Sequence, residues 1–406
     1  MKIFRYNIPT YEDCVEICNQ PESPFYETKS VVDGFPVSLF NYRLAQYSDF
    51  VNPIKDRPEV DAFELRGLTF VFNKDGSLFK RFLLLEKFFN LNQTPDSMYS
   101  VVKDYKIKWV NNKEDGSIAS YIQLPNGKIV GKSKMGFDNE QSLGINRIYN
   151  SRQDVKLFVD WCFQNDITSV FEYVSPANRI VLRYLQEDLI LLRMRDNKTG
   201  KHLDLQEHLN EIGSIRIAPF EDDAEDLDSL IELTDTQVDK EGVIVQAVDK
   251  SGKDFFFKLK TPWYIERHGL LTNDLYREHI LVGYILDEKI DDIISQIPED
   301  EKLAHERINK IISIVKFEVE RKVKEINNLY RIFFDLDSNK KEFALKYSKD
   351  SNFGYVMQMT KRIDTYDLAK GWVRDQTAKL MISRDWLKKK DPTLFFQEPD
   401  TEKQDN

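Results

Sequence analysis

Turn-forming glycines divide the chain into two regions of different character near residue 275. Before that point, short apolar runs alternate with turn sequences such as Asn73-Lys74-Asp75-Gly76 and Pro125-Asn126-Gly127. Glycine supplies the positive φ that tight hairpins require, so these runs predict antiparallel strands. After residue 275 the only glycines are Gly283, Gly354 and Gly371, and apolar residues recur at helical spacing. The sequence therefore predicts an α+β protein, with an antiparallel-sheet domain followed by an all-α domain.

Residue patterns within these regions predict individual elements and boundaries. We expect strands at 37–42, 63–72, 78–85, 107–110, 118–124, 128–132, 169–174, 189–193, 243–248 and 255–260, and helices around 138–150 and 153–164. The acidic block 221–228 predicts the start of a surface helix, because carboxylates complement the dipole there. We expect an extension at 1–35 packed on or joining the first domain, then domains at 36–275 and 276–390, and a frayed polar tail at 391–406.

Composition excludes several classes of protein. The chain has 406 residues, of which 41% are hydrophobic and 31% charged, as in a soluble globular protein. No apolar run approaches the roughly 20 residues that span a bilayer, and the amino terminus lacks the apolar core of a signal peptide. An intracellular, cytoplasmic protein without a membrane partner is expected. Cys14, Cys18 and Cys162 form neither a CxxC pair nor a zinc set, which favours reduced structural thiols.

Charge is distributed unevenly along the chain. The net charge is −10, yet residues 301–390 hold 21 Lys and Arg against 13 Asp and Glu, a local balance of +8. A local basic region matters more for RNA binding than the global sign. Solvated helix faces would explain the same lysines.

The segment Lys113-Glu114-Asp115-Gly116-Ser117 follows the predicted strand 107–110. A lysine delivered by a strand and followed by Asp-Gly is the layout of enzymes that carry AMP or GMP on a lysine. Asp-Gly is also an ordinary turn signal, so the pattern alone fits a surface lysine beside a turn. A lysine attacks the α-phosphorus of a nucleotide only when its amine is neutral, and its reference pKa near 10.4 must therefore be lowered.

Other charged residues could complete such a site. Lys258 and Lys260 alternate along a predicted strand and so share one face, where neighbouring cations or a metal would lower the pKa of a lysine. Lys132 and Lys134 have the same spacing, and for both pairs a solvent-exposed strand edge is the other interpretation. Glu172 lies within an apolar strand, where an unpaired carboxylate would be costly, which favours a site. Carboxylates are also the ligands that Mg²⁺ prefers.

The order of these motifs resembles the covalent nucleotidyltransferases. The set comprises Arg66-Gly67, Lys87-Phe88-Phe89-Asn90, Lys113-Glu114-Asp115-Gly116-Ser117, Lys132-Ser133-Lys134, Phe171-Glu172-Tyr173, Glu241-Gly242 and Lys258-Leu259-Lys260. More narrowly, further segments resemble the family of tRNA-repairing single-strand RNA ligases of T-even bacteriophages: Phe40-Asn41-Tyr42-Arg43-Leu44-Ala45, 86–92, Asn178-Arg179-Ile180-Val181-Leu182 and Lys260-Thr261-Pro262-Trp263-Tyr264. The resemblance covers about residues 35–390.

The resemblance implies an ATP-dependent RNA ligase that works through lysyl-AMP and RNA-adenylate intermediates. It implies ATP and Mg²⁺, which Mn²⁺ could replace, a monomer, and single-stranded RNA or a nicked tRNA anticodon loop as substrate. For a viral protein the compartment would be the host cytoplasm. It also implies ends that carry a 5′-phosphate and a 3′-hydroxyl.

The same resemblance implies roles for particular residues. Lys113 would hold AMP, Lys258 and Lys260 would contact the α-phosphate, and Glu172 and Glu241 would work with Mg²⁺. The residues implied around the nucleotide are Tyr42, Arg66, Lys87, Phe89, Glu114, Gly116, Lys134, Gly242 and Tyr264. Asp291 and Asp292 resemble an acidic metal-binding pair of the family, although a solvated helix start explains them as well.

Three other functions are alternatives to an RNA ligase. DNA ligases and mRNA capping guanylyltransferases resemble one another in carrying a β-barrel domain after the last lysine motif, whereas a helical region follows here. A non-catalytic nucleotide- or RNA-binding relative would lack a motif lysine, and Lys113, Lys258 and Lys260 are all present.

Overall fold

The computed structural model describes residues 8–176, 182, 184–220, 226–267, 278–295 and 302–395. The chain divides into two compact units, Met1–Gly269 and Leu270–Asn406. Within the described residues, no helix is long and apolar enough to cross a membrane.

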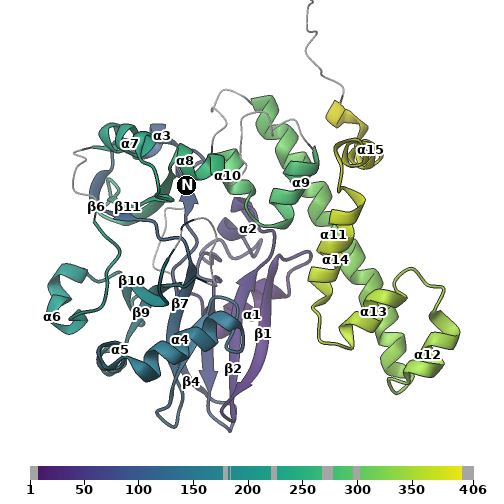
Figure 1. Ribbon diagram of the computed structural model, residues 1–406, viewed down its shortest axis with the longest axis horizontal. Coiled ribbons are helices and arrows are strands. Elements are labelled where there is room, and N and C mark those ends of the chain that lie inside the picture. The colour runs from purple at the N-terminus through teal and green to yellow at the C-terminus, as the bar shows by residue number, and fades with distance from the viewer. Residues whose placement is uncertain are drawn as a thin grey trace, which may run out of the picture. The chain divides into compact units, whose positions relative to one another are not determined.

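The first unit is built on three four-stranded sheets (Figure 1). The first sheet has the order β1 (Phe25–Val32), β2 (Phe35–Tyr42), β3 (Leu68–Phe72), β4 (Leu78–Phe82). The second has the order β10 (Asp188–Asp196), β9 (Ile167–Val174), β7 (Ser117–Gln123), β8 (Ile129–Ser133). The third has the order β5 (Phe89–Asn90), β12 (Asp254–Lys260), β11 (Gly242–Val248), β6 (Lys106–Asn112). All strand pairs are antiparallel except β5 with β12.

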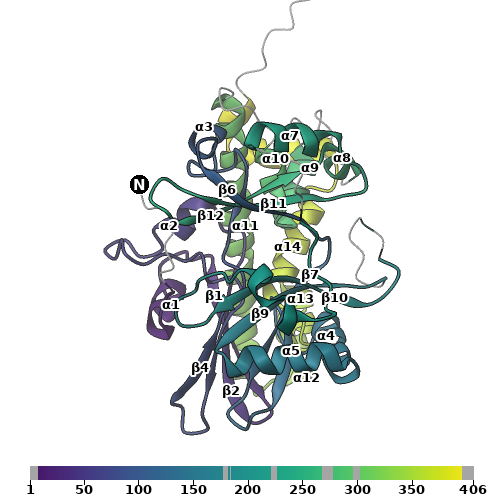
Figure 2. The ribbon, with the colours of Figure 1, turned by 90° about the vertical axis from the view of Figure 1, so that its left-hand side faces the viewer.

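Short helices cover these sheets. They are α1 (Tyr11–Cys18), α2 (Tyr47–Val51), α3 (Tyr99–Val102), α4 (Glu140–Ser151), α5 (Gln153–Gln164), η1 (Leu205–His208), α6 (Leu209–Ile212), α7 (Leu227–Thr236) and α8 (Pro262–Arg267). One apolar core joins the first and second sheets to α4 and α5. A second core packs α1 and α2 on the first sheet, and a third packs α3 and α7 on the third sheet (Figure 2).

The second unit is helical where the structure describes it. Its elements are α9 (Glu278–Leu286), α10 (Ile290–Ile294), α11 (Lys302–Asp335), α12 (Lys340–Tyr347), α13 (Phe353–Met359), α14 (Thr365–Gln376), α15 (Leu380–Lys390) and η3 (Pro392–Phe395). The 34-residue α11 is the longest of them, and α9, α13, α14 and α15 pack on it. Apolar residues at helical spacing, including Phe333 and Val356, form its core.

The structure confirms the predicted α+β class and most of the predicted elements. The predicted strand 63–72 was too long, because only Leu68–Phe72 is a strand and the preceding residues form turns. The predicted strand 78–85 likewise ends at Phe82. The acidic block precedes α7, which begins at Leu227 with Asp226 as its N-cap, while 221–225 lie outside the described residues.

Residues near the amino terminus form a strand of the first sheet, whereas the sequence analysis expected an extension packed on or joining the first domain and assigned it no strand. Strand β1 pairs with β2 from Phe25 to Val32, and Cys14 and Ile17 of α1 are buried in the adjoining core. All three cysteines are free, as predicted. In the tail, residues 392–395 form a 3₁₀ turn, and 396–406 lie outside the described residues.

Candidate functional site

Lys113 lies at the end of β6, beside the hairpin formed by β11 and β12. Its backbone N–H donates to the carbonyl oxygen of Gly242 over 2.8 Å. Its side-chain Nζ lies 2.6 Å from Glu241 Oε2, while Lys260 Nζ lies 3.1 Å from Glu241 Oε1. One carboxylate therefore bridges two lysines that are 147 positions apart in the sequence.

The β11–β12 hairpin fixes this arrangement. At its turn, Asp249 Oδ1 accepts hydrogen bonds from the backbone of Ser251 at 2.7 Å and of Lys253 at 2.9 Å. The resulting register pairs Gly242 with Lys260. The other lysine of this strand, Lys258, pairs with Ile244 and shares the face of Lys260, as predicted from the alternation. The interpretation of this strand as a solvent-exposed edge is wrong for Lys260, because its side chain is only 10% exposed.

Glu172 reaches the same place from β9. Its Oε1 accepts the backbone N–H of Gly116 at 3.0 Å. Burial raises the pKa of Glu172 to about 8; Lys113 opposes this rise and Glu241 adds to it. The Glu172 carboxyl therefore lies close enough to the Lys113–Glu241 ion pair for both charges to affect its pKa.

The raised pKa of Glu172 predicts a pH-dependent stability. A carboxyl whose pKa is 4.5 unfolded and about 8 folded costs nothing below pH 4.5, and its cost grows as pH rises towards 8. In EDTA at pH 8, Glu172→Gln is expected to exceed the wild type in stability by a few kcal/mol, and at pH 5 by much less. Thermal unfolding at both pH values measures this. Glu232→Gln, on the exposed face of α7, is the control, and an equal difference for Glu172→Gln at both pH values would contradict the prediction.

Gly116 allows strand β9 to lie close against the motif loop. A Cβ atom built at this position would lie 2.4 Å from the carbonyl oxygen of Tyr173 and 3.1 Å from Glu172 Cγ. In this structure the missing Cβ therefore makes room for β9, which brings Glu172 next to Lys113.

Acidic residues of the motif hold further segments in place. Asp115 Oδ1 accepts from the hydroxyl of Tyr264, in α8, at 2.8 Å, and Asp115 Oδ2 accepts from the backbone of Leu182 at 2.7 Å. Tyr184 donates its hydroxyl proton to Glu114 Oε2 at 2.7 Å and accepts from the backbone N–H of Asp115 at 3.0 Å. Glu114 and Asp115 are both buried, so the loop after Lys113 is held on two sides.

A group of cations and rings lies at the ends of β2 and β8. Lys134 Nζ lies 4.6 Å from the centre of the Tyr42 ring. Lys87 Nζ lies 5.7 Å from the same ring and 4.9 Å from that of Phe89. Cations over aromatic rings are held without losing their charge, which leaves them able to attract phosphate.

Arg66 and Lys132 have different roles in the structure. Arg66 Nη1 donates to the carbonyl oxygen of Leu85 at 3.3 Å, and its charge acts on Glu172. Lys132 is buried and donates to the carbonyl oxygen of Gly67 at 2.8 Å. The exposed-edge interpretation is wrong for Lys132, because β8 turns this side chain inward under the Arg66 turn.

Asp291 and Asp292 lie in α10, in the second compact unit. They do begin a helix, but the solvated interpretation is wrong for Asp292, which is 8% exposed. The segment 178–181 lies outside the described residues.

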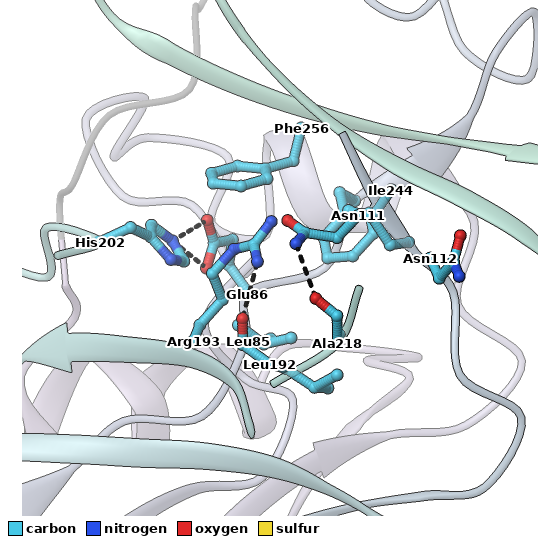
Figure 3. A pocket seen from close by; sticks show the side chains of 11 residues that line it. Leu85, Glu86, Asn111, Asn112, Leu192, Arg193, His202, Ala218, Ile244 and Phe256 are labelled. Carbon is cyan, nitrogen blue, oxygen red and sulfur yellow. Dashed lines mark hydrogen bonds and ion pairs between the residues drawn. The ribbon is translucent and has the colours of Figure 1, made fainter. Parts of the chain in front are cut away.

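A cavity of about 40 Å³ lies close to Lys113, between residues of the second and third sheets. Ile244 and Phe256 line it from the same strand face that carries the lysines. Figure 3 shows the Asn111 amide pointing to Ala218, and the His202 ring facing the Glu86 carboxylate beside Arg193. Its buried polar atoms Asn111 Oδ1, Asn112 Oδ1 and Arg193 Nη2 have no partner within the described chain.

Sequence patterns did not single out several residues around the site. Asp115 belongs to the motif itself, but the sequence analysis gives it no role of its own in the site. Tyr184 carries no local signal, although it contacts the motif loop. The same holds for three residues whose partners come from distant segments: Glu64, Arg195 and His202. Glu86 lies within the segment 86–92, and Asn111 and Arg193 line the cavity.

The fold and this cluster define a protein with a site of paired lysines and carboxylates in its sheet-rich unit. Residues 64–264 match the model of a protein family described as RNA ligase, of the T4 type. A Thermovibrio ammonificans protein described as a candidate RNA ligase is 26% identical over 294 residues, 71% of this chain and 74% of the relative. The matched segment, just under half of the chain, and this relative support the T4-type RNA ligase family for this protein.

Solved structures of RNA ligases also align with the chain. An archaeal ATP-dependent RNA ligase, in its form 2, has a TM-score of 0.44 and 12% identity over 74% of this chain and 76% of that chain. The Naegleria gruberi RNA ligase with pyrophosphate has a TM-score of 0.36 and 18% identity over 45% of this chain and 57% of that chain.

Proposed function

We propose that this protein is an ATP-dependent RNA ligase that joins 5′-phosphate and 3′-hydroxyl RNA ends through AMP carried on Lys113. The observation that carries this proposal is the convergence of four side chains, from within or beside four strands, onto one place: Lys113, Lys260, Glu241 and Glu172. Such a cluster offers a nucleophile, a cation for phosphate and carboxylates for a metal within one site.

In the first step, the lone pair of Lys113 Nζ attacks the α-phosphorus of ATP. An N–P bond forms, the P–O bond to pyrophosphate breaks, and Nζ loses a proton. Glu241 Oε2, which lies 2.6 Å from Lys113 Nζ, is placed to accept this proton. Lys260 then exchanges part of its contact with Glu241 for the phosphate, where its charge stabilises the transition state.

The two later steps move AMP to RNA and then release it. An oxygen of the RNA 5′-phosphate attacks the same phosphorus, so the N–P bond breaks and a pyrophosphate linkage forms. The 3′-hydroxyl of the other end attacks the RNA phosphate, loses its proton and expels AMP. Both steps are phosphoryl transfers, in which positioning and charge neutralisation provide most of the catalysis.

Glu172 and Glu241 fit a divalent cation. The Glu172 carboxyl is buried with its pKa raised to about 8, and the charge of Glu241 contributes to that rise. A cation bound beside the two carboxylates would lower the pKa of Glu172 again. Within the described residues no group of three or more His, Cys, Asp and Glu could hold a metal. Mg²⁺ or Mn²⁺ would therefore take its other ligands from phosphate and water, and when bound it would neutralise phosphate charge.

The nucleoside of ATP is proposed to extend from the lysines towards the cavity between Asn111 and Phe256. This cavity adjoins the lysine-bearing face, has apolar walls and contains three polar atoms without a partner in the described chain. Its 40 Å³ would hold only about three water molecules at 10–15 Å³ each, so a base could enter only if its walls separate.

The test is incubation with α-labelled ATP and a divalent cation, followed by denaturation. Label is expected to remain on the polypeptide with ATP, and peptide mapping should place it at Lys113. Labelling by GTP in place of ATP would favour a capping enzyme, and no label with either nucleotide would refute the proposal.

The second unit is proposed to select the RNA, because the basic surplus of +8 lies within it. A second arm of the same test compares joining of a nicked anticodon stem-loop and an unstructured oligonucleotide. Truncation after Gly269 is expected to leave adenylylation and reduce the preference between these RNAs, and an unchanged preference would contradict this role.

A further inference from the structure

Two cations of the proposed nucleotide site, Arg66 and Lys87, lie in segments outside the strands of the sheets. A strand residue is placed by ladder hydrogen bonds on both sides, whereas a loop residue needs other anchors. Both loops are anchored by a residue of β10.

Arg195 is the common partner of both loops. Its side chain is fully buried, and its guanidinium takes Glu64 in a two-pronged pair, Nη1–Oε2 at 2.9 Å and Nη2–Oε1 at 2.7 Å. The same Nη1 donates to the carbonyl oxygen of Leu84 at 2.6 Å and lies 3.2 Å from Glu86 Oε2. Glu64 is two residues before Arg66, and Glu86 is the residue before Lys87.

Backbone contacts extend this anchoring along the segment that carries Lys87. Leu83 N–H donates to Asn197 Oδ1 at 3.2 Å, and Leu85 accepts from Arg66 at 3.3 Å. Lys87 N–H donates to the carbonyl oxygen of Phe63 at 2.8 Å, which ties the two loops directly together.

The charges around Arg195 balance. Arg193 and Arg195 contribute two positive charges, Glu64 and Glu86 two negative ones. Burial alone would raise the pKa of Glu86, but His202 and Arg195 outweigh it and hold that pKa below its ordinary value. Burial lowers the pKa of His202 and the Glu86 carboxylate opposes this, and His202 Nε2 lies 2.8 Å from Glu86 Oε1. A charge-balanced, hydrogen-bonded group can stay buried and rigid.

We infer that Arg195 is a positioning residue that sets the places of Arg66 and Lys87 relative to each other and so tunes nucleotide binding. This inference rests on the proposed function, since it assigns Arg66 and Lys87 to the nucleotide. Arginine is needed because a lysine offers a point charge and cannot form the two-pronged pair with Glu64 while also holding Leu84 and Glu86.

The experiment compares Arg195→Lys with the unaltered full chain. The KM for ATP in adenylylation is expected to rise about 10- to 100-fold, because misplacement by about 1 Å has effects of that order. The matched control is Arg152→Lys, which also pairs with two carboxylates, Asp154 and Asp188, each at 2.6 Å. That control is expected to leave the KM unchanged.

A double-mutant cycle separates positioning from simple destabilisation. ATP affinity is measured by calorimetry in a Lys113→Ala background, with Arg195→Lys, with Arg66→Ala plus Lys87→Ala, and with all three. If Arg195 acts through the two cations, its substitution has little further effect once they are removed. An equal loss of affinity in both backgrounds, or an unchanged KM, overturns the inference.

Two further results keep the outcomes distinct. If Arg195→Lys does not fold, Glu64→Gln, which keeps the size and one acceptor oxygen, is expected to raise the KM in the same direction by less, and no rise refutes the inference. Absence of AMP labelling in the unaltered protein counts against the proposed function, and the ATP affinities in the Lys113→Ala background still decide the inference about Arg195.

Discussion

Replacing Lys113 with alanine is expected to abolish all AMP labelling of the denatured protein. The alanine side chain has no lone pair that could attack phosphorus, and no other described lysine has both the Glu241 contact and the backbone bond to Gly242. Because the substitution removes the covalent bond itself, the expected loss is complete rather than graded. Autoradiography after denaturing electrophoresis measures it.

The matched control for this prediction is Lys108→Ala. Lys108 lies on the same strand, β6, but on its exposed part, where its Nζ lies 4.9 Å from the ring of Trp109. Labelling of this variant is expected to equal that of the unaltered protein. Label retained by Lys113→Ala would show that another residue carries the nucleotide.

Gly242→Ala is expected to reduce adenylylation by a factor of 100 or more. Gly242 has φ +146°, and a Cβ atom there would lie 2.0 Å from the carbonyl oxygen of Leu259 and 2.7 Å from Lys260 Cα. Relief of this overlap must move β12 away from β11, which shifts Lys260 and the Gly242 carbonyl that holds Lys113. A shift of about 1 Å at reacting groups can cost about 10²-fold in rate.

The same hairpin offers the control for Gly242→Ala. Gly252 also has a positive φ, +83°, but a Cβ atom there meets nothing within 4 Å. Gly252→Ala is therefore expected to cost only the backbone strain, about 1–2 kcal/mol, and to keep its activity. Thermal unfolding measured beside the AMP-transfer rate separates the two effects. A folded Gly242→Ala with normal rate would show that the β11–β12 contact is not needed for Lys113.

Local patterns were sufficient for most of the fold. Alternation and Gly turns predicted the strands because both act over a few residues, as at β11 and β12. They failed at residues 63–67, where apolar residues continue but the chain turns to place Arg66. They were not applied to residues 25–35, although Asp33-Gly34, both at positive φ, form the two-residue turn that joins β1 to β2 and are themselves a local hairpin signal.

Some residues of the candidate site could also be predicted from the sequence, whereas the roles of others could not. The order of motifs was sufficient to select Lys113, Glu172, Glu241 and Lys260, and the structure brings these four together. The alternation of Lys132 and Lys134 suggested equal roles, yet burial separates them: one supports the Gly67 turn and the other lies over Tyr42.

The sequence by itself determined the α+β class and the two strands of the β11–β12 hairpin, because each depends on neighbouring residues, and the order of its motifs singled out the lysine expected to react. Only the tertiary structure decided which charges are buried together. Arg195 meets Glu64 across 131 positions, and Lys113 meets Glu241 across 128. Whether a charge is solvated or buried against a partner depends on what the rest of the chain places beside it, and that determines both its pKa and its role.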